Sequence, residues 1–325
     1  MRRPRILPAF SPEERNRAHF LLASRVAFMM GRKFEEGDWS YVYCRAKGIP
    51  EQGWSNLSVG VMHRGLGVEH KMLGQPSDKP LTSVCGTRLM HPALTRSIRI
   101  PSGQRNANAV MRDVLGQYAQ LVGERRRKLK QNAPEAKPDL RTGWLVWEKG
   151  LREFLYFEEE TLEPDPADYT AEWKESGGGN RKASKNLWVY EKETGHKRYS
   201  ITTSAGAKIQ PYFDVPPPSE PNLYLFKVQG EEISPGRIRV WVTEGTAREL
   251  KSLIGELTAD NLTVVIENAA SEPSDDTAMS EEAREQATPI EVTAEAYGLL
   301  TATFPKAVSD EHMLRMLLTR LQAPS

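Results

Sequence analysis

The chain has little of what marks several large classes of protein. It holds two cysteines, Cys44 and Cys85, in 325 residues, too few for a disulfide framework or a four-thiolate zinc site. The longest apolar stretch near the start, residues 26–30, is too short for a membrane span. Residues 1–5 are basic, but no signal-peptide core follows them. We therefore expect a cytoplasmic protein without a membrane partner.

Motifs of several enzyme classes are also missing. The sequence has no phosphate-cradling Gly-x-x-x-x-Gly-Lys loop, no serine elbow and no helical His-x-x-x-His pair. Neither cysteine has a His or Lys pattern beside it that would favour a nucleophilic thiolate. His63 could act as a general base in another class of nuclease, although a lone histidine is more often a turn or core residue.

Composition and charge favour a globular protein with two unlike halves. Hydrophobic residues make up 39% and charged residues 27%, as in globular proteins, and the length suits two compact units. Residues 1–150 hold 26 Lys or Arg and 13 Asp or Glu, whereas the remainder holds 18 and 30. A basic half predicts a polyanion site. The alternative is that the two halves attract each other within one fold or a dimer.

The first part of the chain reads as helix, hairpin and helix. Ser11, Pro12 and Glu14 form a helix start with a capping box, and the apolar stripe predicts a helix to about Phe34. A second amphipathic piece is expected around residues 39–44. Alternation then predicts a β-hairpin. The expected segments are strands at 57–61 and 65–71, a strand at 96–101, and a helix at 107–130.

The remainder is richer in strand patterns, and no internal repeat is recognised. We expect a basic domain at 1–138, a β-rich domain at 139–267, and an acidic linker with a C-terminal helical segment at 268–325. The expected strands are 151–157, 187–191, 198–203, 209–215, 223–228, 238–243 and 262–266, with a helix at 246–257. Residues 223–228 and 238–243 are expected to pair around a turn at 234–236.

The Glu69-His70-Lys71 segment is the strongest candidate for chemistry. Alternation on a strand puts Glu69 and Lys71 on one face and Val68 and His70 on the other. A carboxylate and an ammonium so placed can hold a divalent cation and the water it activates. Glu-x-Lys occurs four times in the chain, but this copy alone lies on a predicted hairpin strand after a capped helix.

That context resembles the PD-(D/E)xK nuclease superfamily over roughly residues 12–130. The resemblance implies an α/β protein with a mixed α+β sheet and a restriction-endonuclease-like core, followed here by the β-rich domain. It further implies that Glu69 binds Mg²⁺, or Mn²⁺ in its place, and that Lys71 orients the attacking water or helps to deprotonate it. Residues 31–35 are similar to the family's helix element, which makes Glu35 a candidate catalytic residue and metal ligand.

One part of the family pattern is missing. The first strand of the hairpin is expected to carry an acid about ten residues before Glu69, near Ser58 or Gly60, and none is there. Either Glu51 or Glu35 completes the metal site, or the site is incomplete and the fold only binds. Glu69 and Lys71 could also be an ordinary ion pair on a solvated strand face.

Basic and aromatic side chains are the candidate nucleic-acid contacts. The basic cluster after residue 124 could equally reflect the favourable position of cations at a helix C-terminus. Aromatic side chains on predicted strands could stack on bases, or they could belong to the core. The phosphate candidates are Arg64, Arg96, Arg99, Arg105, Arg125, Arg126, Arg127 and Lys128, and the aromatic candidates are Trp188, Tyr190, Tyr199 and Tyr212.

These features lead to three hypotheses. The first is a Mg²⁺-dependent DNA endonuclease of restriction type, hydrolysing phosphodiester bonds with metal-activated water. The second is a non-catalytic protein of a phage or mobile element that binds DNA or RNA and contacts a protein partner, or a second copy of itself, through its acidic half. The third is a structural subunit whose charged halves pack head to tail.

Overall fold

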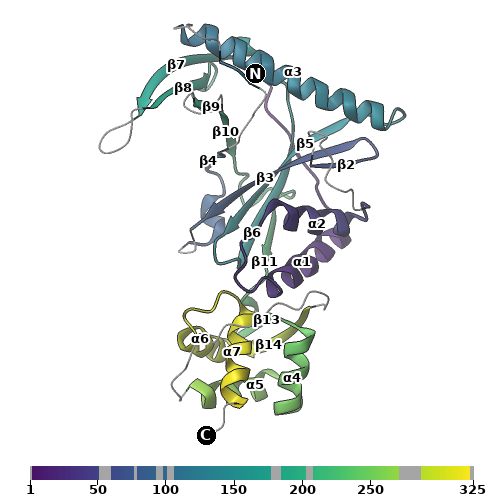
Figure 1. Ribbon diagram of the computed structural model, residues 1–325, viewed down its shortest axis with the longest axis vertical. Coiled ribbons are helices and arrows are strands. Elements are labelled where there is room, and N and C mark those ends of the chain that lie inside the picture. The colour runs from purple at the N-terminus through teal and green to yellow at the C-terminus, as the bar shows by residue number, and fades with distance from the viewer. Residues whose placement is uncertain are drawn as a thin grey trace.

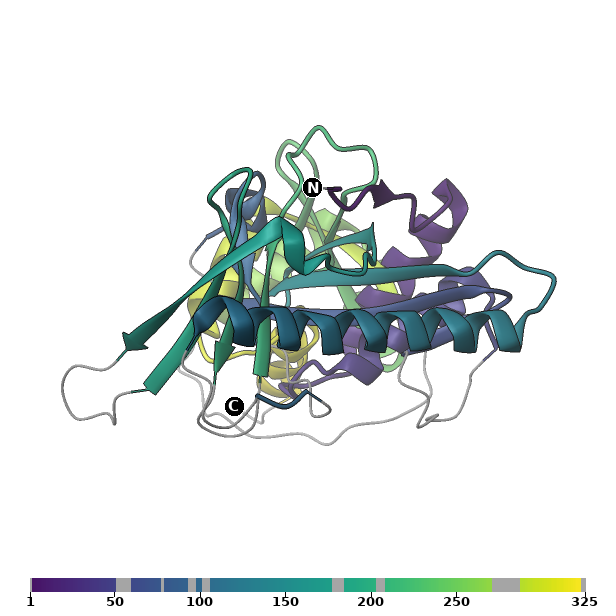
Figure 2. The same ribbon diagram turned by 90° about the horizontal axis from the view of Figure 1, so that it is seen from above.

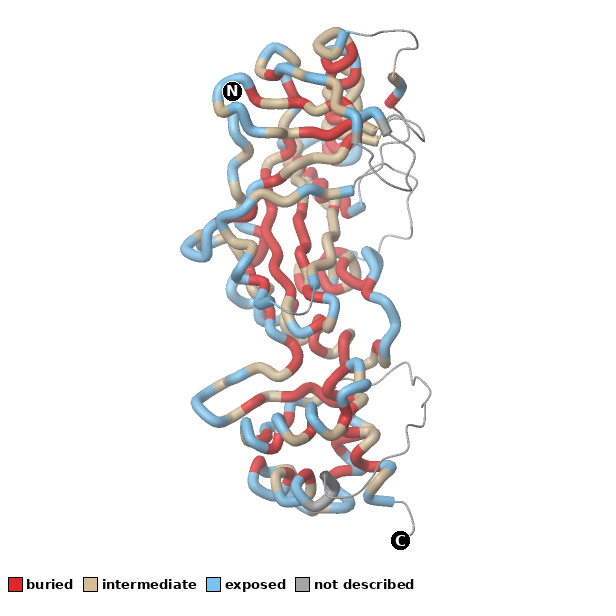
Figure 3. The backbone as a smooth tube through the Cα atoms, turned by 90° about the vertical axis from the view of Figure 1, so that its left-hand side faces the viewer, coloured by how far each residue is buried: buried red, intermediate tan, exposed pale blue. Residues whose placement is uncertain are grey.

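The computed structural model describes residues 2–50, 60–76, 79–92, 98–100, 106–176, 184–202, 208–270 and 287–322. The chain forms an elongated molecule in which three β-sheets follow one another along the long axis (Figure 1). Buried residues run along the central strands and continue into the unit that holds the C-terminus (Figure 3). The fold is a mixture of helices and mixed sheets, in agreement with the expected α+β class.

The central sheet is mixed and has the strand order β1–β6–β5–β3–β2, with β11 also paired to β6. β3 and β5 run parallel over ten residue pairs, and the helix α3 (Ala107–Asn132) connects them. The other pairings are antiparallel. The strands are β1 (Ile6–Leu7), β2 (Val61–His63), β3 (Leu66–Gln75), β5 (Asp139–Glu148), β6 (Glu153–Glu160) and β11 (Tyr224–Lys227).

Two helices cover the face of this sheet opposite α3. α1 (Pro12–Ala27) begins with the predicted capping box of Ser11 and Glu14. The expected end near Phe34 is wrong, because the chain leaves the helix after Ala27 and turns through Gly31 at φ 86°. α2 (Glu36–Lys47) matches the second predicted piece and ends at a left-handed glycine.

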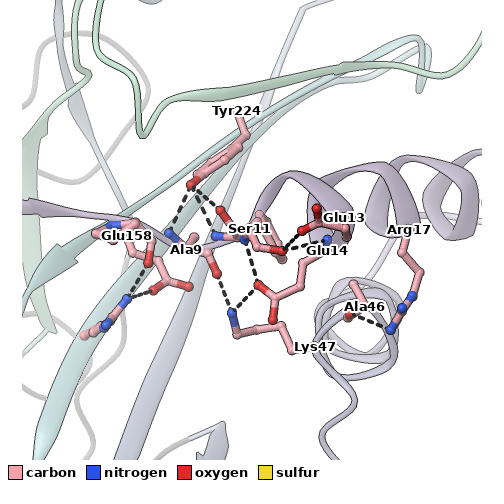
Figure 4. A network of polar contacts seen from close by, with 12 residues as sticks. Ala9, Ser11, Glu13, Glu14, Arg17, Ala46, Lys47, Glu158 and Tyr224 are labelled. Atoms are coloured by element: carbon pink, nitrogen blue, oxygen red, sulfur yellow. Dashed lines mark hydrogen bonds and ion pairs between the residues drawn. The ribbon is translucent and has the colours of Figure 1, made fainter.

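A polar network fastens the start of α1 to its neighbours (Figure 4). The Tyr224 hydroxyl on β11 accepts hydrogen bonds from the backbone N–H groups of Ala9 and Phe10, both at 3.2 Å. The Lys47 ammonium, at the end of α2, donates to the Ala9 carbonyl at 2.5 Å and to Glu14 at 3.0 Å. These bonds join segments that are far apart in the sequence, so α1 and α2 are held in one orientation over the sheet.

The second sheet is antiparallel and has the order β4–β10–β9–β8–β7. α3 packs on one of its faces and also crosses the central sheet (Figure 2). The hairpin of β8 and β9 and the strand β10 were predicted correctly. The strands are β4 (Arg88–Met90), β7 (Tyr169–Ser176), β8 (Ser184–Glu191), β9 (Lys197–Thr202) and β10 (Lys208–Asp214).

The strand expected at residues 96–101 is not found in its described part. Residues 98–100 are irregular and pair with no strand of the described chain. Ile98 is buried against α3. Its apolar alternation therefore reflects packing on a helix. The edge position of the sheet is filled instead by β4, which pairs with β10.

The third sheet belongs to a C-terminal unit with its own apolar core. A strand–helix–helix unit occurs twice, and Thr243 and Thr293 each cap the helix that follows their strand. Val240 and Ile290, which are equivalent in the two copies, pair with each other. The elements are β12 (Glu231–Ser234), β13 (Arg237–Thr243), α4 (Glu244–Ile254), α5 (Ala259–Ala270), β14 (Ala287–Thr293), α6 (Ala294–Thr303) and α7 (Asp310–Gln322).

Several expected pairings and limits differ from this arrangement. The strand expected at 262–266 is part of α5, where Leu262 and Ile266, four residues apart, bury on one helix face. β11 pairs with β6, not with β13. The expected limit at residue 138 falls before β5, which pairs with β3, so residues 1–138 do not complete the central sheet. β14 likewise joins the sheet of β12 and β13.

None of the helices in the described ranges has both the length and the apolar character needed to cross a membrane. α3, the longest of them, carries polar and charged residues throughout its second half.

We predict that Asp310 makes the stability of the C-terminal unit depend on pH. Its carboxylate accepts hydrogen bonds from the Gly230 N–H at 2.9 Å and the Tyr297 hydroxyl at 3.0 Å. Burial nevertheless raises the pKa of Asp310 to about 6. The folded state therefore binds a proton more tightly than the unfolded state, so this contribution to stability is complete below pH 4 and is lost as the pH rises through 6.

Urea unfolding of the protein and of Asp310→Asn at several pH values between 4 and 7.5 measures this effect. The unaltered protein should lose about 2–3 kcal/mol relative to the variant over that range. Parallel stability profiles for the two proteins would show that Asp310 titrates normally.

Candidate functional site

β3 divides its side chains between two faces, as the alternation predicted. Val68 and His70 are buried and face α2, where His70 packs against Tyr43 with ring centroids 4.9 Å apart. Glu69 and Lys71 are partly exposed on the other face, which α3 crosses, and Lys71 Nζ lies 2.5 Å from Glu69 Oε1. The two members of the motif are therefore in contact with each other.

Arg125 of α3 is a second cation on Glu69. Its guanidinium donates a hydrogen bond to Glu69 Oε2, and its side chain is 12% exposed. Burial alone would raise the pKa of Glu69, but Lys71 and Arg125 outweigh that effect and lower the pKa below its ordinary value. Glu69 is thus a carboxylate at neutral pH, held between two cations.

Glu36, the first residue of α2, brings a second carboxylate to this place. Val61 pairs with Val68 across the β2–β3 hairpin, so continuing the register by one residue brings Gly60 opposite Glu69. Glu36 Oε1 lies 3.7 Å from the position that a Cβ atom on Gly60 would take. Partial burial and the charge of Glu69 raise the pKa of Glu36, against the opposing effect of Lys71. A carboxylate therefore occupies the position where the strand lacks an acid.

Glu35, the candidate from sequence, has a different role. It is the N-cap of α2, and its backbone N–H donates to Asp38 Oδ2 at 2.9 Å in a capping box. Asp38 is buried and forms ion pairs with Arg25 and Arg32. These contacts stabilise the start of the helix. Glu51, the other candidate metal ligand, lies outside the described residues.

The Glu69 face continues across the sheet into a groove of about 760 Å³. Glu69 pairs with Thr142 on β5, which pairs with Glu159 on β6. The indole of Trp144, beside Lys71, donates to Glu159 at 2.9 Å. Burial raises the pKa of Glu159. The groove therefore holds carboxylates from β3 and β6, with Arg126 and Arg198 among its other lining residues.

The described phosphate candidates differ in exposure and in the contacts they make. Arg64 is exposed in the β2–β3 turn, and Arg99 is exposed beside α3. On α3, Arg126 donates to the Thr161 carbonyl, whereas Arg127 is 73% exposed and Lys128 is exposed. Arg125 forms an ion pair with Glu69. Arg96 and Arg105 lie outside the described residues.

Histidines near the groove are poor candidates for a general base. Burial lowers the pKa of His70 to about 3 and, together with Lys71, that of His91 to about 4. A ring nitrogen of His91 lies 2.9 Å from the Met72 carbonyl. His63 is at the end of β2, where it pairs with Leu66 and not with Glu69.

Glu36 and Glu69 form a pair of acids, not a larger cluster. Within the described ranges, no group of three or more His, Cys, Asp or Glu side chains is arranged to hold a metal ion. A two-carboxylate site is still compatible with Mg²⁺, which is commonly held by one or two carboxylates and several waters.

Comparison with known proteins identifies no relative of this chain. No protein-family model, no curated protein and no solved structure matches the chain. The functional interpretation therefore depends on the geometry of the groove.

Proposed function

We propose that this chain is a Mg²⁺-dependent DNA endonuclease whose site consists of Glu69, Lys71 and Glu36. The observation that carries the proposal is the contact of Glu69 with Lys71 in an open groove. A second carboxylate, Glu36 at the start of α2, is close enough for the charges of Glu69 and Lys71 to shift its pKa. The order of elements supports it as well. The motif lies on the second strand of a hairpin that follows a capped helix, and the helix α3 comes after it, which is the order of helix, strands and helix that the resemblance to PD-(D/E)xK nucleases implies.

The two carboxylates suit a magnesium ion by number and chemical type. They come from a strand and from the first turn of a helix, two elements whose positions are fixed by the packing of α2 on β3. Bound there, Mg²⁺ would supply Lewis-acid activation of water and of a phosphoryl oxygen.

The side chains have distinct roles in the proposed hydrolysis. Lys71 would orient the attacking water through its ammonium group. The water oxygen bonds to phosphorus and gives its proton to solvent, while the P–O ester bond breaks and the leaving oxygen takes a proton from solvent. Glu69 holds the ammonium group of Lys71 in place, since the two are in contact. Arg125 neutralises Glu69 in the metal-free protein and can donate to a phosphate oxygen when Glu69 binds a metal ion.

A non-catalytic protein that binds DNA or RNA is the second candidate. It is favoured by the ion pairs of Glu69, because both of its carboxylate oxygens are already bonded to cations, one to Lys71 and one to Arg125. In that case Glu69 would have a structural role, and exposed cations such as Arg64, Arg127 and Lys128 would contact phosphates.

We predict that the protein nicks or cuts plasmid DNA with Mg²⁺ or Mn²⁺ and not with EDTA. Lys71→Ala and Glu36→Gln should each lower the rate by roughly 100-fold or more, the usual size of losing a positioned catalytic group. Glu35→Gln is the matched control. It changes the neighbouring acid, which caps α2, and should retain most of the activity.

Equal losses in Glu35→Gln and Glu36→Gln would contradict the assignment of Glu36. Cleavage that survives Lys71→Ala would support an endonuclease but would contradict the assignment of its site to Glu69 and Lys71. Salt-sensitive retention of DNA without any cleavage would select the binding protein instead.

We also predict that a carboxylate placed on the strand at residue 60 can replace that of Glu36. Gly60→Asp places an acid opposite Glu69, and its Cβ would meet no atom closer than 3.5 Å. In the Glu36→Gln background this change should restore at least a tenth of the cleavage rate, because a carboxylate again faces Glu69 (~1.4 kcal/mol for each tenfold change).

Gly60→Ala in the same background is the control, because it adds a side chain without a charge. Rescue by Asp and not by Ala would identify the carboxylate as the group that Glu36 provides. Failure of both, with metal-dependent cleavage intact in the unaltered protein, would place the second metal ligand elsewhere.

A further inference from the structure

The second sheet has one face covered by α3 and one face lined with aromatic and basic side chains. The covered face contributes Leu187, Val189, Tyr199 and Ile201 to an apolar cluster with α3. Alternation along β8 sends Trp188 and Tyr190 to the opposite face. Neither residue belongs to an apolar cluster of the described chain, and both are partly exposed. We call this opposite face, with Trp188, Tyr190, Tyr212, Lys174 and Lys197, the aromatic face.

Lysine ammonium groups rest on the rings of this face. Lys197 Nζ lies 3.5 Å from the ring centroid of Trp188 and 4.8 Å from that of Tyr212. Lys174 Nζ lies 5.9 Å from the Trp188 ring. Such contacts keep positive charge on a flat π-surface. Two acids of the described strands share this face and both are in ion pairs. Glu172 is bonded to Lys174 at 3.2 Å and to the Tyr190 hydroxyl at 2.7 Å. Asp214, two residues after Tyr212 on β10, is paired with Arg88 at 2.6 Å.

We propose that the aromatic face binds a single strand of nucleic acid, with unpaired bases stacked on Trp188, Tyr190 and Tyr212 and phosphates held by Lys197 and Lys174. Bases stack on aromatic side chains, and lysines neutralise the backbone. Lys197 covers Trp188 in the free protein and would move to a phosphate as a base takes its place on the ring.

The spacing of the rings favours a single strand over a duplex. Trp188 and Tyr190 are two residues apart on β8, so their attachment points are about 6.8 Å apart. Successive bases in a duplex rise by about 3.4 Å, half that distance. Neighbouring bases can therefore reach both rings only when the strand is extended and unstacked.

The aromatic face is joined to the groove. Tyr212 is one of the aromatic residues and also lines the groove that holds Glu69. Its neighbour Phe213 stacks on Trp144 of the central sheet, with ring centroids 3.9 Å apart. Tyr212 therefore lies at the boundary between the aromatic face and the groove. Binding itself needs neither a metal ion nor cleavage, so the inference does not depend on the proposed nuclease activity.

Fluorescence anisotropy with labelled 12-nucleotide probes in EDTA tests the proposal. The probes are oligo-dT, oligo-rU and a duplex of the same length. Both single strands should bind more tightly than the duplex, and the ratio of their affinities tells DNA from RNA as the preferred strand. Trp188→Ala should weaken binding about 5- to 100-fold. Lys197→Ala should reduce the slope of log affinity against log salt by about one charge.

Trp173→Phe is the matched control, because Trp173 lies on the same sheet but packs toward the α3 side. Ultraviolet cross-linking of an iodouridine probe to the unaltered protein gives an answer that needs no variant, and the cross-links should fall on Trp188, Tyr190 or Tyr212. Cross-links elsewhere, equal losses in Trp173→Phe, duplex binding as tight as single-strand binding, or no binding of any probe would each overturn the proposal.

Discussion

The parallel pairing of β3 with β5 is the constraint on which the rest of the structure depends. Parallel neighbours need a crossover, and α3 provides it. The crossover brings Arg125 over Glu69 and presses Leu129 so close to β3 that a Cβ on Gly67 would lie 2.7 Å from it. Because a parallel pair is stable only when both faces are covered, α1 and α2 must take the other face. The same helix then continues over the second sheet and joins the two sheets into one body.

Neighbouring residues of β3 lie in two different environments, one on each face of the sheet. Glu69 and Lys71 face the groove, while His70 is enclosed by Trp39, Tyr43 and Tyr156. A slip of one residue would exchange the two sets and bury two charges among aromatic rings. The close fit of Gly143, where an added Cβ would lie 2.4 Å from the Tyr156 hydroxyl, makes the register stricter still. The position of the candidate site is therefore enforced by the core behind it.

Local signals in the sequence predicted much of this arrangement, and the misses have physical causes. The α1 cap, the β8–β9 hairpin and the two faces of β3 follow from neighbouring residues alone. The apolar residues 262–266 suit a strand or a helix equally well until Leu262 and Ile266 meet a core. The sequence pattern pointed to Glu35, and no local signal distinguishes it from Glu36, the first residue of α2. Which acid faces Glu69 depends on where α2 begins, and its packing on the sheet decides that.

Part of the charge asymmetry between the halves of the chain is offset by contacts within the fold. Ion pairs join the basic half to the acidic half, among them Arg88 with Asp214, Arg141 with Glu158, and Arg2 with Glu160. The groove around Glu69 likewise combines residues of both halves, because Glu159 and Glu160 of β6 line it together with Glu69. Arg126 and Arg198 line the same groove, so a polyanion there would meet charges of both signs. The aromatic face carries Lys174 and Lys197, and its acids Glu172 and Asp214 are paired with Lys174 and Arg88. Because these acids are already in ion pairs, they oppose the phosphates of the proposed single strand less than unpaired carboxylates would.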